Sequence, residues 1–363
     1  MDMVNPRSAR TILTILAAMI GLSACSSKPL VPYSTDTPPL ALLPAALAGI
    51  EDKRSRFREI YCTVLEARKH DLPDYRSCDE ALTRVGEEPE DTGQPIDLGH
   101  SKMGLVAAEI PGVGWDCIEG WLNYDELAYE HVGQFGFEGM RLKVEGLSGT
   151  ETNARMIRDG LQTQAAEIGD RPVVLIGYSK GTPDILEAIV MYPELRERIV
   201  AVVSVAGAVG GSPVAYDVEQ KQLHIMKYAP KADCTSGDGG AIESLRPVVR
   251  QKWLAQNPLP ADIAYYSLVT YPEPERISLL LGGTYKDLSQ IDSRNDGQLL
   301  FYDQLIPGSS LLGFINADHW AVVVPIARSH PFVGSTFVDK NDYPREALLE
   351  ALLRFLEEDL AEK

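Results

Sequence analysis

The sequence is poor in basic residues. Its 363 residues contain 34 Lys and Arg against 52 Asp and Glu, which gives a formal net charge of −18. Nucleic-acid binding needs a surplus of cations to neutralise phosphates, so this balance predicts no nucleic-acid partner. Internal repeats and Cys/His clusters with zinc-site spacing are also absent, which argues against a repeat architecture and a zinc protein. The remaining composition, 45% hydrophobic and 24% charged, is that of an ordinary globular protein.

Long hydrophobic runs are missing except near the N-terminus. There, Arg7 and Arg10 precede an apolar run, residues 11–21, which has about the length of a signal-peptide core and is too short to span a bilayer. The run leads into L-S-A-C, ending at Cys25, which resembles the lipobox of bacterial lipoproteins. The resemblance implies cleavage before Cys25, a lipid on its thiol and attachment to a membrane of the cell envelope. The next residue is Ser rather than Asp, which favours the outer membrane; the alternative is an ordinary secretory signal.

Cysteine is also scarce, with five residues in the chain. Export to an oxidising compartment would allow disulfides among the four that remain besides Cys25. These four allow three pairings, and the sequence alone does not choose between them. We favour Cys62 with Cys78, because they are near in sequence and lie in one predicted helical hairpin, which leaves Cys117 with Cys234. Closing so short a loop in the unfolded chain is worth about 3 kcal/mol in the chain-entropy model.

The chain divides into four predicted segments. Residues 1–24 form the signal peptide and residues 25–49 a Pro-rich tether. Residues 50–101 have helical periodicity and are expected to form a helical N-terminal extension, an appended cap before the sheet. Residues 102–363 are expected to form the main domain. Within it, residues 207–263 are longer than a crossover needs and predict an inserted lid.

Strands alternate with amphipathic helices along the main domain. This alternation predicts an α/β fold with a mostly parallel sheet, flanking helices and right-handed crossovers. The expected strands are residues 104–110, 140–144, 173–176, 199–205, 264–270 and 311–315. The expected helices include residues 118–131, a helix capped by Thr150 or Thr152, and the closing helix 343–360.

One stretch of the chain carries a chemical motif. The apolar run at residues 173–176 leads into Gly177-Tyr-Ser179-Lys-Gly181, a G-x-S-x-G sequence, and helical periodicity follows. A serine at the tip of so tight a turn needs glycine neighbours, because the strand and helix backbones approach closely there. The stretch resembles the nucleophile elbow of the α/β-hydrolases, in particular the serine esterase and lipase group, which makes Ser179 the expected nucleophile. The alternative is an ordinary glycine-rich loop.

The resemblance implies that an acid and then a histidine follow the serine along the chain. His319 lies in a loop after the last expected strand, where this fold places its base, and His330 is its rival. Asp296, in Asn-Asp-Gly-Gln-Leu, resembles the segment that carries the acid in many lipases and esterases, although Asn-Asp-Gly is also a good turn sequence. Asp292 and Asp318 are the alternates for the acid.

An oxyanion formed in such a reaction needs two backbone N–H donors. The resemblance assigns one donor to Lys180, the residue after the nucleophile. It assigns the other to the loop after strand 104–110, where Val113 is preferred and Gly112 is second, although Pro111 stands where the family usually shows His. Four tryptophans near these loops or in the lid are expected either to line an acyl pocket or to pack beneath the loops: Trp115, Trp121, Trp253 and Trp320.

Taken together, the resemblance implies a serine hydrolase that cleaves carboxylic esters, of lipids or small molecules, through an acyl-enzyme at the cell envelope. No cofactor and no metal are expected. Two alternatives stay open: an inactive hydrolase fold that serves as an envelope binding or scaffold protein, and an acyltransferase that uses the same triad. The sequence departs from the family in one respect, because no hairpin of two strands is evident before Lys102, and we therefore expect a shortened sheet.

Overall fold

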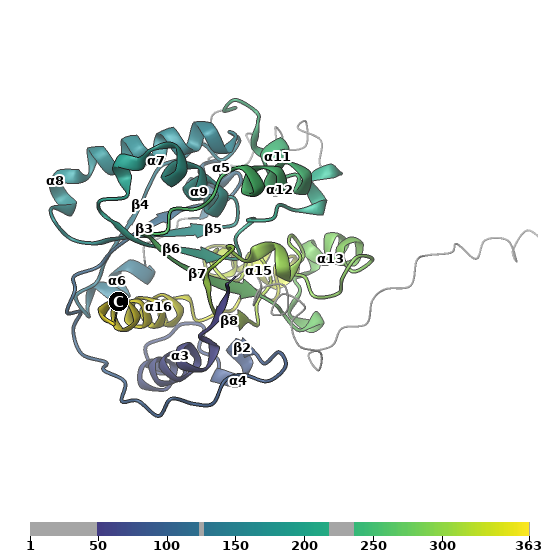
Figure 1. Cartoon of the computed structure of the whole chain (residues 1–363). Helices are drawn as coiled ribbons and strands as arrows, with labels where there is room; N and C mark the ends of the chain where they lie inside the picture. The colour runs from purple at the N-terminus through teal and green to yellow at the C-terminus, as the bar shows by residue number, and fades with distance from the viewer. Residues whose placement is uncertain (1–48, 123–126, 218–235, 363) are drawn as a thin grey trace, which may run out of the picture.

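A sheet of eight strands forms the centre of the part of the chain that the computed structural model describes, residues 49–122, 127–217 and 236–362 (Figure 1). The strand order is β1-β8-β7-β6-β5-β3-β4. Strand β2 pairs antiparallel with β8, and every other pairing is parallel, which confirms the predicted α/β class. The strands are β1 (Glu51–Asp52), β2 (Leu82–Thr83), β3 (Val106–Ile110), β4 (Glu138–Arg141), β5 (Val173–Tyr178), β6 (Ile199–Val205), β7 (Ala264–Thr270) and β8 (Ser310–Ile315).

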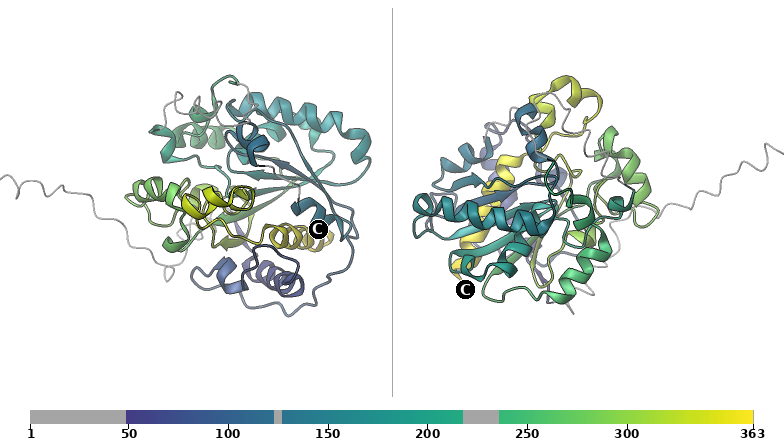
Figure 2. Two further views of the ribbon diagram at one scale, coloured as in Figure 1. Left: turned by 180° about the vertical axis from the view of Figure 1, so that it is seen from behind. Right: turned by 90° about the horizontal axis from the view of Figure 1, so that it is seen from above.

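Helices cover both faces of the sheet, and each face has its own hydrophobic core (Figures 1 and 2). Alternate residues of β5 show the division: Val173 and Leu175 pack toward α7, α8 and α9, while Val174 and Ile176 pack toward α3, α6 and α16. The helices are α3 (Arg54–Arg68), α4 (Cys78–Ala81), α5 (Trp115–Leu122), α6 (Leu127–Gly133), α7 (Thr150–Thr163), α8 (Ala165–Ile168), α9 (Gly181–Met191), α11 (Ala241–Ser244), α12 (Pro247–Gln256), α13 (Gly282–Leu288), α14 (Ile326–Ser329), α15 (Pro331–Thr336) and α16 (Arg345–Ala361). No helix in these described ranges is long and apolar enough to cross a bilayer.

Several predicted elements differ in detail from the observed ones. The predicted helix 118–131 is two helices, α5 and α6, on either side of residues 123–126, which lie outside the described ranges. The predicted strand 140–144 is β4, which begins and ends a few residues earlier. Neither Thr150 nor Thr152 caps α7, since the helix begins at Thr150 itself and Gly149 occupies the capping position.

The N-terminal extension is part of the sheet and not an appended cap. Strands β1 and β2, both before residue 102, pair with β8 and extend the sheet edge. Helix α3 packs against α16, and Phe57 belongs to the main core. In the described residues no hairpin precedes Lys102, as expected, because β1 and β2 each pair with β8 and not with each other. The two short strands themselves were not predicted. Strands of two residues are too short to show an alternating pattern, so the sequence gives no signal for them.

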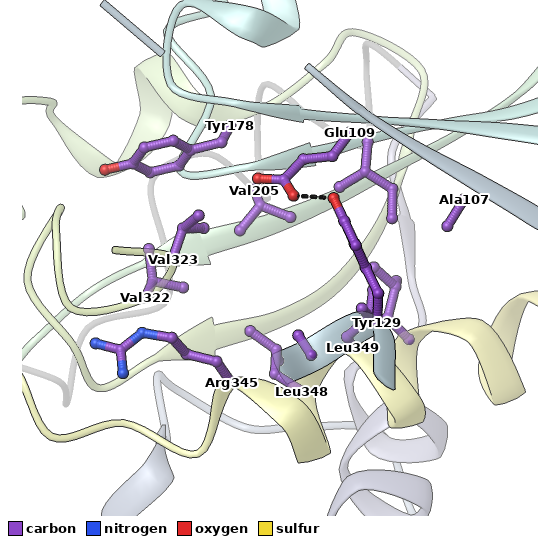
Figure 3. A pocket seen from close by; sticks show the side chains of 13 residues that line it. Ala107, Glu109, Tyr129, Tyr178, Val205, Val322, Val323, Arg345, Leu348 and Leu349 are labelled. Atoms are coloured by element: carbon purple, nitrogen blue, oxygen red, sulfur yellow. Dashed lines mark hydrogen bonds between the residues drawn. The ribbon is translucent and has the colours of Figure 1, made fainter. Parts of the chain in front are cut away.

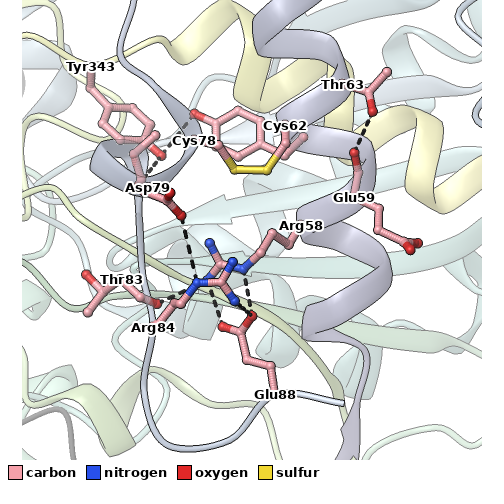
Figure 4. The surroundings of a disulfide bond; sticks show 12 residues. Arg58, Glu59, Cys62, Thr63, Cys78, Asp79, Thr83, Arg84, Glu88 and Tyr343 are labelled. Carbon is pink, nitrogen blue, oxygen red and sulfur yellow. Dashed lines mark hydrogen bonds and ion pairs between the residues drawn. A yellow bond between two sulfur atoms is a disulfide. The ribbon is translucent and has the colours of Figure 1, made fainter. Parts of the chain in front are cut away.

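A disulfide joins Cys62 of α3 to Cys78 of α4, as predicted (Figure 4). Beside it, the Tyr61 hydroxyl lies 3.1 Å from that of Tyr343, which precedes α16. The bridge thus closes the helical hairpin at the point where it packs on the last helix. Cys234 lies outside the described residues, so its pairing with Cys117 remains a prediction.

The predicted lid is described in two parts, residues 207–217 and 236–263. The second part, residues 236–263, is hydrogen-bonded to the start of α7. Asp238 accepts hydrogen bonds from the Gly149 amide at 2.8 Å and from the Thr152 hydroxyl at 2.6 Å. The Ala241 amide donates to the Leu147 carbonyl nearby. This part of the segment is therefore built into the domain.

Candidate active site

Ser179 lies at a strained turn between β5 and α9. Its φ is 53°, in the left-handed region that residues other than glycine rarely occupy. Close packing explains the two glycines of the motif: a Cβ at Gly177 would lie 2.5 Å from Thr182 Cα, and a Cβ at Gly181 would lie 2.0 Å from the Ile110 carbonyl oxygen. The local geometry is that of a nucleophile elbow.

Three of the predicted side chains meet at this turn. His319 Nε2 lies 2.9 Å from Ser179 Oγ, and His319 Nδ1 lies 2.8 Å from Asp296 Oδ2. His319 and Asp296 are buried. The serine follows β5, the aspartate follows β7 and the histidine follows β8, so the carboxyl edge of the parallel sheet brings them together from distant parts of the chain.

The alternates for acid and base are engaged elsewhere. Asp292 pairs with Arg294, its neighbour in the same loop. Asp318 accepts hydrogen bonds from the amides of Ser278, Trp320 and Ala321, which shape the loop that carries the histidine. Burial raises the pKa of Asp318, and these donors oppose that shift. His330 lies at the start of α15, outside the described lining of the pocket at Ser179.

The predicted oxyanion loop lies directly against Ser179. A Cβ at Gly112 would be 2.9 Å from Ser179 Cβ, and Gly112 and Val113 line the same pocket as Ser179 and His319. Within the described ranges, the backbone amides of Val113 and Lys180 donate no hydrogen bond to the protein. Both amides therefore remain available as donors, one in the pocket wall and one in the residue that follows Ser179.

Solved structures provide the comparison, since no protein-family model and no curated protein matches the chain. The chain is similar to the metagenomic carboxyl esterase MGS0156, with 38% identity over 90% of this chain and 97% of the other and a TM-score of 0.80. The chain belongs to this family of carboxyl esterases. The Bacillus licheniformis lipase BlEst2 in its propeptide form shares the fold at 17% identity, with coverage of 66% of this chain and 51% of the other and a TM-score of 0.50. Its mature form matches at 19% identity, over 67% and 95% of the two chains, with a TM-score of 0.49.

The predicted acid, Asp296, has a partner that sequence reasoning missed. Thr270, the last residue of β7, donates its hydroxyl to Asp296 Oδ2 at 2.5 Å. The other carboxylate oxygen, Oδ1, accepts the amides of Gln298 at 2.9 Å and Leu299 at 2.7 Å. Asp296 is thus held on both oxygens, with one of them facing His319. The only sequence signal for Thr270 was its position at the carboxyl end of a predicted strand.

Tyr178, the residue before Ser179, holds the loop that carries His319. Its hydroxyl donates to the His319 carbonyl oxygen at 2.7 Å, and the two rings lie 5.3 Å apart between centroids. The side chain is buried, and burial raises the pKa of its hydroxyl well above the usual value, so it remains a protonated donor. Tyr178, the first variable position of the G-x-S-x-G motif, therefore has a structural role.

The esterase has a pocket of about 290 Å³ at Ser179. None of the described lining residues is Asp, Glu, Lys or Arg. Two of the four predicted tryptophans, Trp115 and Trp320, line it, and Trp253 instead packs in the core beside α7 and α9. The remaining lining residues are Gly112, Val113, Ile118, Tyr178, Ala208, Ser212, Val214, Ala215, Ile242, Leu245, Gln298, Leu299 and Val324.

A second cavity, of about 70 Å³, lies between the sheet and α16 (Figure 3). It is largely apolar, and the Tyr129 hydroxyl donates to the Glu109 carboxylate in its wall. Tyr178 lines both cavities, but neither Ser179 nor His319 lines the smaller one. The larger pocket is therefore the candidate substrate site.

Proposed function

We propose that this esterase hydrolyses carboxylic esters through an acyl-enzyme on Ser179. The observation that carries the proposal is the hydrogen-bonded chain from Ser179 Oγ through His319 to Asp296 at a strained turn. A serine hydroxyl is a weak nucleophile, and a histidine in this position can remove its proton as the hydroxyl attacks.

The proposed reaction has two halves. Ser179 Oγ bonds to the ester carbonyl carbon while its proton passes to His319 Nε2. The carbon–oxygen bond to the alcohol then breaks, and the alcohol leaves with the proton from His319. Water attacks the acyl-enzyme in the same way, giving its proton to His319, and Ser179 regains a proton as the acid leaves. Asp296 keeps the imidazole in the required orientation throughout.

The negative charge on the carbonyl oxygen is proposed to lie against the amides of Val113 and Lys180. Val113 lines the same pocket as Ser179, Lys180 follows Ser179 in the chain, and neither amide donates to another described residue. Donors that are fixed before the reaction stabilise the developing charge most effectively. The start of α9 adds a favourable dipole at the Lys180 amide.

The pocket supports uncharged esters of small to medium size as substrates. Its volume of about 290 Å³ is near the lower end of the range for small-molecule sites, and its described lining is mainly apolar. A charged acyl or alcohol group would find no ion-pair partner among the described lining residues. Hydrolysis rates measured across esters of increasing chain length would place the optimum.

Substitution of the nucleophile is the direct test of the mechanism. We expect Ser179→Ala to lower kcat on a chromogenic ester by about 10⁴-fold or more while the protein still folds. A fluorophosphonate should label the native protein at Ser179 and leave the variant unlabelled, because it reacts with activated serines. An unchanged rate in Ser179→Ala would refute the mechanism. Absence of both labelling and hydrolysis in the native protein would favour an inactive scaffold.

We further propose that the esterase is attached to the cell envelope by a lipid on Cys25. The support is the signal-like N-terminus and the lipobox-like sequence, both of which lie outside the described residues. Cys25→Ser should abolish incorporation of labelled palmitate and release the protein from the membrane fraction. Release without any difference in labelling would contradict the proposed anchor.

A further inference from the structure

A buried ion pair lies directly behind the proposed oxyanion donor at Lys180. Lys180 Nζ contacts Asp184 Oδ1 at 2.7 Å and Oδ2 at 2.8 Å, and the two side chains are only 1% and 0% exposed. A cation at the start of a helix opposes the helix dipole, and burying an ion pair seldom increases stability over an apolar pair. Fold stability alone therefore gives little reason for this pair.

Asn153 of α7 connects the ion pair to a neighbouring loop. Its amide nitrogen donates to Asp184 Oδ2 at 2.7 Å and to the Glu145 carbonyl at 3.1 Å. Its amide oxygen accepts the Glu145 backbone N–H at 3.1 Å. The Asn153 side chain is buried, and these three bonds use both of its N–H groups and its oxygen. A continuous polar chain therefore runs from Lys180 to the backbone at Glu145.

The next residue, Gly146, supports the loop that carries the other oxyanion donor. Its carbonyl accepts the Gly114 amide at 3.1 Å. A Cβ at Gly146 would lie 2.4 Å from Gly114 N and 2.6 Å from Gly114 Cα, so the two backbones are in direct contact. Gly114 follows Val113, and any shift of residues 145–146 would therefore move the Val113 amide.

We propose that Asp184 and Asn153 are positioning residues that fix the distance between the two oxyanion donors, the amides of Val113 and Lys180. The proposal rests on the proposed function. Neither side chain lines the substrate pocket, so each acts only through the loops that it holds. Oxyanion donors must be in place before the charge develops, and displacements of about 1 Å in such sites can reduce rates by about 100-fold.

The decisive variant replaces the ion pair without leaving a lone buried charge. K180M/D184L keeps both backbone amides and substitutes apolar side chains of similar length, and such replacements are often tolerated in protein interiors. We expect a thermal midpoint within a few degrees of the native value. We also expect kcat to fall about 10- to 100-fold while KM changes by less than about threefold, because the loss concerns the transition state.

A second variant and a control separate positioning from general damage. Asn153→Ala breaks the link to Glu145 and leaves the ion pair intact, and it should lower kcat in the same direction. The control, R58M/E88L, removes a pair that is also buried, with both side chains 8% exposed, and that lies beside the disulfide (Figure 4). This control should leave kcat unchanged in the folded protein.

The readout specific to the oxyanion site is the affinity for a trifluoromethyl ketone, which forms a tetrahedral anion on the active serine. That affinity should fall in parallel with kcat/KM in both test variants. Two results would overturn the proposal. One is a native kcat and a native ketone affinity in folded K180M/D184L. The other is a loss of kcat no larger than the loss of folded protein. If K180M/D184L does not fold, Asn153→Ala decides by the same criteria. A native protein without ester hydrolysis or serine labelling would instead refute the proposed function.

Discussion

The contacts that support Ser179 fall into two groups, which differ in kind. The base side comprises the contacts to Asp296 and His319, and the oxyanion side comprises the contacts to the loops of Val113 and Lys180. On the base side, Thr270 and two amides bind the Asp296 carboxylate itself, and Tyr178 binds the backbone of His319. On the oxyanion side, a buried ion pair and Asn153 hold loops and do not touch a reacting group. The difference follows from what each side contributes to the proposed reaction.

A catalytic side chain can adopt several rotamers, and hydrogen bonds from neighbouring residues to its own polar atoms can select one of them. A catalytic backbone amide must keep its N–H free for the substrate, so it can be fixed only through the chain on either side of it. We therefore expect variants on the base side to act through single hydrogen bonds, with modest and local effects. Variants in the Lys180–Asp184–Asn153 chain should act through loop position.

Thr270→Val should give the largest effect among the supporting residues of the base side. The substitution conserves shape and removes the hydroxyl that donates to Asp296 Oδ2. Hydrogen bonds to charged groups are worth about 1.5 to 3 kcal/mol, so we expect kcat to fall about 10- to 100-fold with little change in KM. Steady-state kinetics measure this directly. Thr270→Ser restores a hydroxyl and should recover most of the rate; equal losses in both variants would contradict the assigned role.

Tyr178→Phe should have a smaller effect. It removes one hydrogen bond, from the Tyr178 hydroxyl to the His319 carbonyl, and leaves the ring in place. We expect a loss of about 1 kcal/mol in stability and a two- to fivefold lower kcat. The matched control is Tyr266→Phe, which removes a buried hydroxyl donating to Asp359 at 2.7 Å on the face of α16. Equal kcat values in the two variants would show that Tyr178 only stabilises the fold.

The sequence predicts the strands and the main site residues, but not the contacts that support those residues. Strands β6 and β7 were predicted to the residue, because a continuous apolar run flanked by breaks reflects burial on both faces. The positions of Ser179, Asp296 and His319 followed from a motif and from chain order. The contact of Thr270 with Asp296 did not, since it joins residues 26 positions apart through the exact geometry of a loop.

The buried ion pair shows a different limit. The i to i+4 spacing of Lys180 and Asp184 was visible in the sequence, but it is the spacing of ordinary exposed helix pairs. Only the packing of α7 against α9 shows that this pair is buried and bonded to Asn153. Similarly, β1 and β2 depend on pairing with β8, more than 200 residues away, and not on any local pattern.

A buried charged cluster around Glu350 provides the reference for both sides. Glu350 of α16 is fully buried and accepts hydrogen bonds from Arg354 and Arg68 and contacts His131 Nε2 at 2.7 Å. It lines neither cavity described above. Burial alone would raise the pKa of Glu350, but its partners outweigh burial and lower this pKa to about 2.

Glu350→Gln should therefore change stability and leave kcat unaltered. A carboxyl with a lowered pKa contributes stability at pH values above its unfolded pKa of about 4.5, and this contribution is lost as the pH falls toward 2. At pH 7 we expect the free energy of unfolding of the variant to be about 3 kcal/mol lower, because three cationic or polar side chains no longer face a buried carboxylate. The difference from the native protein should shrink at pH 3, where the unfolded carboxyl is already protonated. Thermal unfolding at both pH values measures this change. A kcat that falls in folded Glu350→Gln would mean that any buried charge in this fold affects the reaction, and the distinction between the two sides of Ser179 would be lost.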